Sequence, residues 1–276
     1  MPPFATAERV AVDGTELAVR RAGAGPALLL LHGIPTSSRL WDEVGADLSA
    51  GFDVIAPDML GYGESAQPAD RDVSMAAQAR LVPPLLDALG VERVVLVGHD
   101  LGGAVAQRVA VEAPERISGL VLIDSVSFDS WPIARMRVLR ALTPPFTRRW
   151  PRAWFGWFDR SMRRYIPKGE PREAFAAGLS AWSRDRASAE AWIRNTRAMD
   201  PQITAEIAPR LAEIAVPAHV VWGKDDRFQK ERWAPRLRDA IPGATLTVLD
   251  GGHFLPWDRP AEVAAEVRSL AARVPA

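Results

Sequence analysis

The sequence predicts an α/β fold in which a mostly parallel sheet is covered by helices on both faces. Two observations lead to this fold class. Short, continuous apolar runs such as residues 27–31 and 94–97 are typical of strands buried on both faces. Amphipathic stretches separate these runs, and such alternation favours parallel strands joined by crossover helices. With 276 residues, 48% of them hydrophobic, the chain is long enough for one large domain with an insertion or two small domains.

The predicted elements run from an N-terminal hairpin to a C-terminal helix. Asp13-Gly14 marks a tight turn between strands at residues 10–12 and 16–20. Further strands are expected at residues 27–31, 52–56, 94–97, 120–123, 218–222 and 245–249. Helices are expected at residues 40–48, 75–89 after a Ser74 cap, 101–112, 230–240 and 259–272.

The composition changes between residues 126 and 212. This segment contains fifteen Arg and one Lys against eight Asp and Glu, and six of the ten tryptophans, although the whole chain has a formal net charge of +0. Three helices are expected in it, near residues 150–165, 172–184 and 188–199. We interpret 126–212 as a helical cap inserted into a core of residues 1–125 and 213–276. Its arginines are interpreted as a solvated face rather than a nucleic-acid patch.

The most informative motif joins the strand at 94–97 to the helix at 101–112. It reads Gly98-His99-Asp100-Leu101-Gly102-Gly103. Its glycines let the backbone turn sharply between strand and helix, which is the G-x-Nuc-x-G pattern of a nucleophile elbow. Asp100 occupies the position usually held by serine. The alternative interpretation, in which Asp100 forms an Asx turn or a helix N-cap, does not explain the flanking glycines.

An aspartate nucleophile indicates substitution at a saturated carbon. A serine that displaced a leaving group there would form an ether, which water and a histidine cannot cleave. A carboxylate would form an ester, which they can cleave. The motif therefore points to cleavage of a carbon–halogen bond or an epoxide carbon–oxygen bond.

Polar residues follow the carboxyl ends of the predicted strands, where active sites gather in sheets of this kind. They are His32, Asp100, Asp124, Asp226 and His253. Because these strand ends meet at one edge, we expect the five side chains to lie close together.

The chain resembles the α/β-hydrolase superfamily over essentially its whole length. The motifs concerned are residues 32–38, the glycine-rich loop 57–63, the elbow 98–103 and Asp250-Gly251-Gly252-His253. The order of nucleophile, acid and histidine is that of the family. Within the superfamily, the branch with aspartate nucleophiles is the most similar: haloalkane dehalogenases, haloacetate dehalogenases and epoxide hydrolases.

The resemblance implies a two-step reaction. Asp100 would attack a saturated carbon, and His253 would then deprotonate a water that attacks the resulting ester. Asp226 is expected to orient His253, with Asp124 as the alternative acid. No cofactor is implied.

The resemblance also implies an oxyanion hole and a leaving-group site. The backbone N–H groups of Ile34 and Leu101 would hold the oxyanion. Haloalkane dehalogenases hold halide with side-chain N–H donors near these positions, but neither Ile34 nor Leu101 has one. The arginine pattern of haloacetate dehalogenases is also absent. Epoxide hydrolases use cap tyrosines, and Tyr165 is the one tyrosine in this cap.

The sequence therefore favours hydrolysis of an epoxide on a small hydrophobic substrate, with dehalogenation as the alternative. Tryptophans of the cap would form an apolar pocket wall. The candidate substrate-binding residues are Trp154, Tyr165, Trp182 and Trp192. A ligand-binding protein without turnover and an acyl hydrolase are further alternatives. The acyl hydrolase would have to form an anhydride from a stable ester.

Other features restrict the remaining classes. The absence of cysteine excludes disulfides and thiolate metal sites, and the four histidines lack metal-ligand spacing, so no metal is expected. No apolar run is long enough to span a membrane, and no secretory signal is recognisable. We expect a cytoplasmic monomer or homodimer that acts on a small molecule and water, without nucleic acid or membrane as partner.

Overall fold

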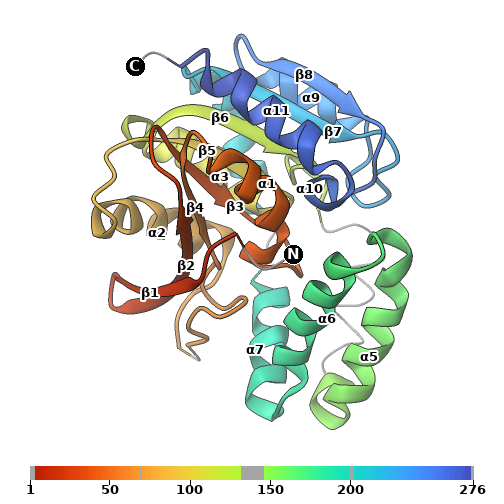
Figure 1. The fold of residues 1–276 in the computed structure, drawn as a ribbon. Helices are drawn as coiled ribbons and strands as arrows, with labels where there is room; N and C mark the ends of the chain where they lie inside the picture. The colour runs from red at the N-terminus through yellow and green to blue at the C-terminus, as the bar shows by residue number, and fades with distance from the viewer. Residues whose placement is uncertain (1–3, 69, 132–145, 199–201, 275–276) are drawn as a thin grey trace.

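The computed structural model describes residues 4–68, 70–131, 146–198 and 202–274. Its strands are β1 (Ala7–Val12), β2 (Thr15–Ala22), β3 (Ala27–Leu31), β4 (Asp53–Pro57), β5 (Val94–His99), β6 (Ile117–Ile123), β7 (Ala218–Gly223) and β8 (Thr245–Leu249). They form one eight-stranded sheet in the order β1-β2-β4-β3-β5-β6-β7-β8 (Figure 1). Strands β3 to β8 pair in parallel, and β1 and β2 form the antiparallel hairpin. The α/β-hydrolase fold class predicted from the sequence is confirmed.

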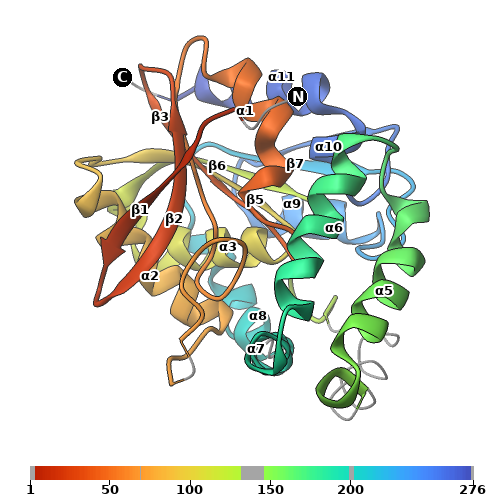
Figure 2. The same ribbon diagram turned by 60° about the horizontal axis from the view of Figure 1, so that its bottom comes forward.

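The helices of the core are α1 (Asp42–Leu48), α2 (Met75–Ala88), α3 (Leu101–Glu112), α9 (Trp233–Ala240), α10 (Leu255–Asp258) and α11 (Pro260–Ala271). Helices α1 and α11 pack together on one face of the sheet, and α2 and α3 pack together on the other (Figure 2). Ser74 caps α2, as expected, because its hydroxyl accepts a hydrogen bond from Ala77 N at 3.2 Å. Among the described residues, no helix combines the length and apolar character needed to cross a bilayer.

A second group of helices lies beyond the carboxyl edge of the sheet (Figures 1 and 2). It comprises α5 (Pro151–Met162), α6 (Glu170–Ser183) and α7 (Arg186–Arg197). Pro151 occupies the first turn of α5, where its missing N–H costs nothing. The first helix was expected to reach residue 165, but α5 ends at Met162 and a tighter 3₁₀ turn follows, Arg163–Tyr165. Met199, the expected end of the third helix, lies outside the described residues.

The helical group is joined to the core through α7 and the chain that follows it. Asn195 on α7 donates a hydrogen bond to the carbonyl of Gly61 at 2.7 Å. The short helix α8 (Gln202–Ile207) and the 3₁₀ segment Ala208–Glu213 pack against α3 of the core instead of against α5 or α6. We refer to α5, α6 and α7 as the cap helices, and the division into a core and a cap of residues 126–212 stays a prediction.

The elbow depends on close backbone contacts that only glycine allows. A Cβ atom at Gly102 would lie 2.3 Å from the carbonyl oxygen of Leu31, and one at Gly98 would lie 2.4 Å from that of Gly102. Both contacts involve backbone, which cannot give way as a side chain can. The turn is therefore compatible with α3 packing directly on β3 and β5 only if both positions lack a side chain.

We predict opposite effects for two helical glycine-to-alanine substitutions. Gly102→Ala should lower the free energy of unfolding by about 2–4 kcal/mol because Cβ collides with the backbone of β3. Gly156→Ala on α5 is the matched control, since nothing lies within 4 Å of its added Cβ. It should raise stability by about 0.5–1 kcal/mol through helix propensity. Urea unfolding of both variants checks this, and equal effects would contradict it.

Candidate active site

Asp100 lies at the sharp turn between β5 and α3. Its backbone has φ 52° and ψ −116°, a conformation that L-residues rarely adopt and that costs about 1–3 kcal/mol. The turn points the carboxylate back over the first βα loop, where Oδ2 accepts a hydrogen bond from Ile34 N at 2.9 Å. The N–H of Leu101 at the start of α3 also favours the ionised carboxylate. Asp100 is thus buried, with both backbone donors directed at its carboxylate.

The pKa of Asp100 reflects two opposing influences. Burial raises the pKa above the usual value for aspartate, because a charge is costly away from water. The charge of His253 and the N–H groups of Ile34 and Leu101 oppose that rise, since they stabilise the anion. The anion is therefore held by protein donors in place of water.

His253 lies between two carboxylates. Its Nδ1 is 2.8 Å from Oδ2 of Asp226, and its Nε2 is 3.8 Å from Oδ1 of Asp100. The first distance is a hydrogen bond, and the second is longer than one. Oδ1 of Asp226 in turn accepts from the N–H groups of Phe228 at 2.6 Å and Gln229 at 2.9 Å. These bonds fix the orientation of the carboxylate and, through it, of the imidazole.

The pKa of His253 is raised above the usual histidine value. Burial alone would lower it, but the charge and hydrogen bond of Asp226, together with the charge of Asp100, outweigh burial. Part of the basicity of His253 therefore depends on the negative charge of Asp100.

Asp124, the alternative acid, lies beside Asp226 and does not hydrogen-bond to His253. Its Oδ1 accepts from Gly223 N at 2.7 Å, at the end of β7. Burial, reinforced by the charge of Asp226, raises the pKa of Asp124 well above the usual range. Burial thus favours the protonated form of Asp124, and its φ of 44° shows a sharp turn after β6.

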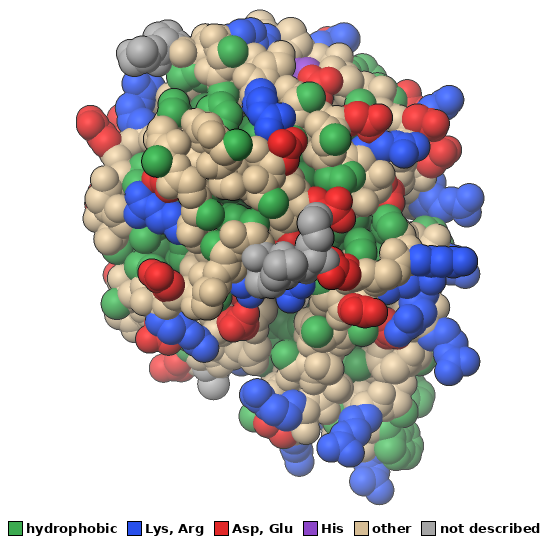
Figure 3. All heavy atoms as spheres, in the orientation of Figure 1, with side chains coloured by type: hydrophobic (Ala, Val, Ile, Leu, Met, Phe, Trp, Pro, Cys, Tyr) green, Lys and Arg blue, Asp and Glu red, His purple; other side chains and the backbone are tan. Residues whose placement is uncertain are grey.

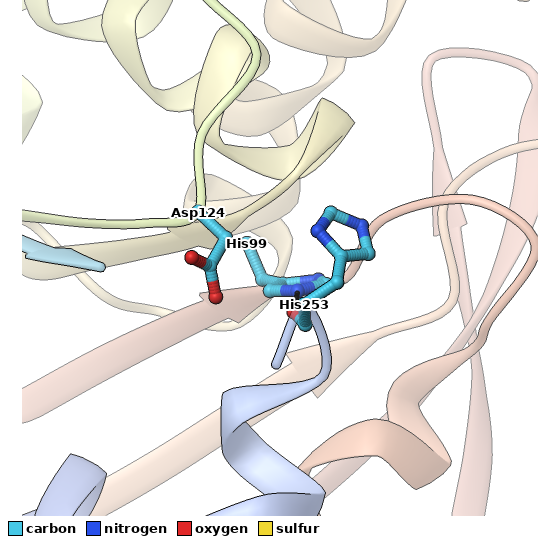
Figure 4. A group of neighbouring side chains, drawn as sticks. All are labelled: His99, Asp124 and His253. Carbon is cyan, nitrogen blue, oxygen red and sulfur yellow. Dashed lines mark hydrogen bonds between the residues drawn. The ribbon is translucent and has the colours of Figure 1, made fainter. Parts of the chain in front are cut away.

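His99 completes the buried polar group around His253. Figure 4 shows His99, Asp124 and His253 together at the strand ends. One nitrogen or oxygen atom from each lies within 4.8 Å of the others. His99 Nε2 lies 2.7 Å from the carbonyl of His253, and burial lowers the pKa of His99 well below its usual value. His99 therefore acts as a neutral hydrogen-bonding support for the His253 loop.

Two tyrosines approach the Asp100–His253 pair from different sides. Tyr62, in the glycine-rich loop after β4, is buried between the His32 ring at 5.6 Å and the Trp182 ring of α6 at 5.9 Å. Burial first, and the charge of Asp100 second, raises the pKa of Tyr62 well above its usual value. Its phenol consequently keeps its proton.

Tyr165 approaches from the histidine side. Its ring lies 5.0 Å from that of Phe228, which is itself 5.0 Å from the His253 ring. Tyr165, Phe228 and His253 line a cleft of about 330 Å³, with Arg164 and Arg227 among its other walls. This cleft leads from the surface to the imidazole.

The structure separates the four cap residues expected to contact substrate. Trp182 reaches the core through Tyr62, and Tyr165 reaches it through Phe228. Trp192 packs inside the cap against Phe155 and Trp182. Trp154 lines a hollow on α5 with Phe146, Trp150, Ala153 and Trp157. The substrate-binding roles of all four stay predictions.

Two residues next to the site, Tyr62 and Phe228, are not predicted as site residues from the sequence. Tyr62 was treated as part of a glycine-rich loop, and Phe228 was not considered. The signal for Phe228 was its position two residues after Asp226, because the turn that presents the carboxylate also presents this ring. The signal for Tyr62 was weaker, since its placement depends on the loop folding back over His32.

Comparisons with known proteins agree with this architecture. The family model described as alpha/beta hydrolase fold matches residues 26–203, and the chain belongs to that family. Haloalkane dehalogenase 2 of Mycobacterium bovis is 32% identical over 89% of this chain and 87% of its own. An epoxide hydrolase of Caballeronia sordidicola is 29% identical over 94% and 91%. An alpha/beta hydrolase fold protein from Burkholderia ambifaria superposes with a TM-score of 0.86 at 27% identity, covering 95% and 97%.

We predict that the two acids affect the titration of His253 differently. Asp226→Asn removes the charge and the hydrogen bond that raise the pKa of His253, so this pKa should fall. Asp124 is not among the groups that shift the pKa of His253, so Asp124→Asn should leave that pKa almost unchanged. NMR titration of the imidazole measures both. A larger fall in the Asp124 variant would assign the acid to Asp124 instead.

Proposed function

We propose that this protein hydrolyses an epoxide of a hydrophobic substrate through an ester on Asp100. The observation that supports this most is the geometry around the Asp100 carboxylate. One oxygen accepts a backbone hydrogen bond while the other faces a histidine that is itself bonded to Asp226. A carboxylate held in this way has one oxygen free for attack and a base beside the bond it would form.

In the first step, Oδ1 of Asp100 attacks a ring carbon of the epoxide. The carbon–oxygen bond of the ring breaks, and its electron pair moves to the oxygen, which needs a proton. Oδ2 keeps its hydrogen bond from Ile34 and becomes the carbonyl oxygen of the ester. The donors that hold the resting carboxylate are thus already placed for the intermediate.

In the second step, His253 removes a proton from water, and the hydroxide attacks the Cγ carbon of Asp100. The negative charge moves to Oδ2, where the Ile34 and Leu101 N–H groups stabilise it. The tetrahedral species then expels the diol with Oδ1, which takes the proton from the His253 imidazolium as it leaves, and the oxygen from water stays on Asp100. Asp226 stabilises the imidazolium that forms.

The change in charge on Asp100 links the two steps. Before reaction, the carboxylate raises the pKa of His253 and favours the protonated ring. Ester formation removes that negative charge, so the pKa of His253 falls and the neutral base becomes favoured. The histidine therefore gains its base form when the ester is present for hydrolysis.

The epoxide oxygen requires a donor in the first step. Tyr62 is protonated, lies within the electrostatic range of Asp100 and has its ring against Trp182. Tyr165 is the second phenol, on the side of His253. We therefore add Tyr62 to Tyr165 as a candidate acid.

Dehalogenation is the second candidate. A relative with the name haloalkane dehalogenase 2 covers most of the chain. The indole N–H groups of Trp131 and Trp192 are buried without a hydrogen-bond partner among the described residues, and such donors suit a halide. The same Asp100 ester and the same His253-dependent hydrolysis would serve this reaction. An acyl hydrolase and a ligand-binding protein without turnover remain alternatives that require no alkyl ester.

We predict that His253→Gln accumulates the alkyl ester. Attack by Asp100 does not need the imidazole as base, whereas hydrolysis does. Intact-mass spectrometry should show one added substrate mass after incubation with a styrene-oxide-like epoxide. Asp100→Asn/His253→Gln is the control and should add none. A panel of haloalkanes identifies the alternative, since addition of the alkyl group with halide release would indicate dehalogenation.

We predict that oxygen from water enters Asp100 before it enters product. In a single turnover in H₂¹⁸O with excess enzyme, product should contain unlabelled oxygen at the attacked carbon. Peptide mass spectrometry should find the label in the peptide containing Asp100. Label that appears directly in product and never in the side chain would exclude the ester mechanism.

We predict that Tyr62→Phe slows epoxide opening by about 10²–10⁴-fold, the range for loss of a general acid. The rate of ester formation in the His253→Gln background measures this step alone. Tyr165→Phe is the matched comparison. If only the Tyr165 variant is slowed, Tyr62 is a packing residue and the acid belongs to the cap.

A further inference from the structure

An exposed aromatic surface lies on the outer side of the cap, away from Asp100 and His253. Phe146, Trp150 and Trp157 are 52%, 56% and 48% exposed, the three largest exposures among the large hydrophobic side chains described. With Ala153 and Trp154 they line an apolar hollow of about 310 Å³. We call these five residues the aromatic surface. Exposed apolar area of this kind marks an interaction site.

The aromatic surface spans a break in the helix at Trp150, whose φ of −140° and ψ of 64° are not helical. Trp150 N donates to the carbonyl of Phe146 at 2.8 Å, and Trp154 N donates to that of Trp150 at 3.0 Å. Ring pairs follow the same line, with 6.3 Å between Phe146 and Trp150 and 5.2 Å between Trp154 and Trp157. Spacing of three and four residues places Ala153, Trp154 and Trp157 on one face of α5. Phe146 and Trp150 line the same hollow from before the break.

The opposite apolar face of α5 already has a partner. Phe155, Phe158 and Met162 are buried, and the first two pack against Trp192 of α7. Helix α5 therefore has two apolar faces, of which one holds the cap together. Of the aromatic surface, Trp154 is partly buried against the core, whereas Phe146, Trp150 and Trp157 are exposed.

Arginines border the aromatic surface on its solvent side. Arg149, Arg152 and Arg160 are exposed and form no ion pair among the described residues, and the Arg149 guanidinium lies 5.7 Å from the Trp150 ring centre. Figure 3 shows Lys and Arg side chains gathered on the side of the molecule where α5 runs. A helix with tryptophan and phenylalanine beside a row of arginines has the composition of helices that lie in a membrane interface.

We propose that the aromatic surface of α5 docks on the surface of an anionic lipid bilayer. Indole and phenyl rings enter the interfacial region while the bordering arginines contact lipid phosphates. This attachment is peripheral and differs from the expectation of no membrane partner, which rested on the lack of a spanning segment. It is independent of the reaction at Asp100.

Charge distinguishes a bilayer from a second copy of this chain. A symmetric dimer through the aromatic surface would bring Arg149 and Arg160 of each copy close to the same residues of the other, and like charges repel. Anionic headgroups have the opposite charge. Tryptophan is also enriched at bilayer interfaces, where the ring is partly apolar and its N–H stays hydrated.

The test is flotation of the full-length protein with vesicles of phosphatidylglycerol and phosphatidylcholine, against vesicles of phosphatidylcholine alone. Binding should occur with the anionic vesicles and weaken as salt rises. Trp150→Ala/Trp157→Ala should reduce it by about tenfold or more. Arg149→Glu/Arg160→Glu should do the same. Quenching of tryptophan fluorescence by brominated lipid should disappear in the tryptophan variant.

A matched variant tests charge alone. Arg9→Glu/Arg80→Glu makes the same change in net charge on β1 and α2, where both side chains are exposed. It should bind as the wild type does. Circular dichroism confirms that each variant is folded before binding is compared.

Several outcomes would overturn the proposal. They are the absence of vesicle binding, equal binding to neutral vesicles, and binding that survives the Trp150 and Trp157 substitutions. Loss of binding in the Arg9→Glu/Arg80→Glu control would show that vesicle binding depends only on the net charge of the protein. A concentration-dependent dimer that the tryptophan variant abolishes would identify a self-association surface, and equal affinity for soluble polyglutamate would identify an acidic polypeptide partner.

Discussion

The organisation of the site depends on the hydrogen bond between Ile34 N and the carboxylate of Asp100. It spans two separate βα connections and holds a buried charge away from water. Such a charge is tolerated only where donors and counter-charges replace its hydration. Gly33 permits the approach, because a Cβ atom there would lie 2.5 Å from the Asp100 side chain. This contact depends on the strained turn at Asp100 and on the lack of a side chain at Gly33.

A second constraint comes from the grouping of three aspartates around one imidazole. Asp100, Asp124 and Asp226 are all buried near His253, and three negative charges there would repel one another strongly. The three carboxylates differ in the backbone N–H donors that each one receives. Asp226 has two backbone N–H donors, Asp100 has the two of the proposed oxyanion hole, and Asp124 has the single N–H of Gly223. With a single backbone donor, Asp124 has its pKa raised well above the usual range by burial.

The sequence was sufficient for the sheet and for the positions of the residues at its edge. Continuous apolar runs define buried strands, and every residue expected at that edge follows a strand end in chain order. It was insufficient where a contact depends on distant segments. Asp124 and Asp226 both follow strands, and only the three-dimensional arrangement places Asp226 against Nδ1 of His253. The roles assigned to these residues await the experiments.

The cap was the least predictable part. Helical periodicity located α5, α6 and α7, yet it could not separate aromatic side chains that face the core from those that face solvent. Trp154 and Trp182 have the same residue type and belong to the same helical unit, but one borders the outer hollow and the other contacts Tyr62. A periodic pattern specifies that a helix has an apolar side. It does not specify what covers that side, which depends on how helices pack.

The hydrogen bond from Asn195 to the Gly61 carbonyl has a mechanical consequence. Loop 58–65 is also fastened at Leu60, which exchanges two bonds with Gln78 of α2, so α7 is tied to a segment that the core itself restrains. Helix α7 cannot move away from the core without breaking the hydrogen bond between Asn195 and Gly61 and disturbing the neighbouring Tyr62. The cleft beside Phe228 reaches His253 by a route that leaves this hydrogen bond intact.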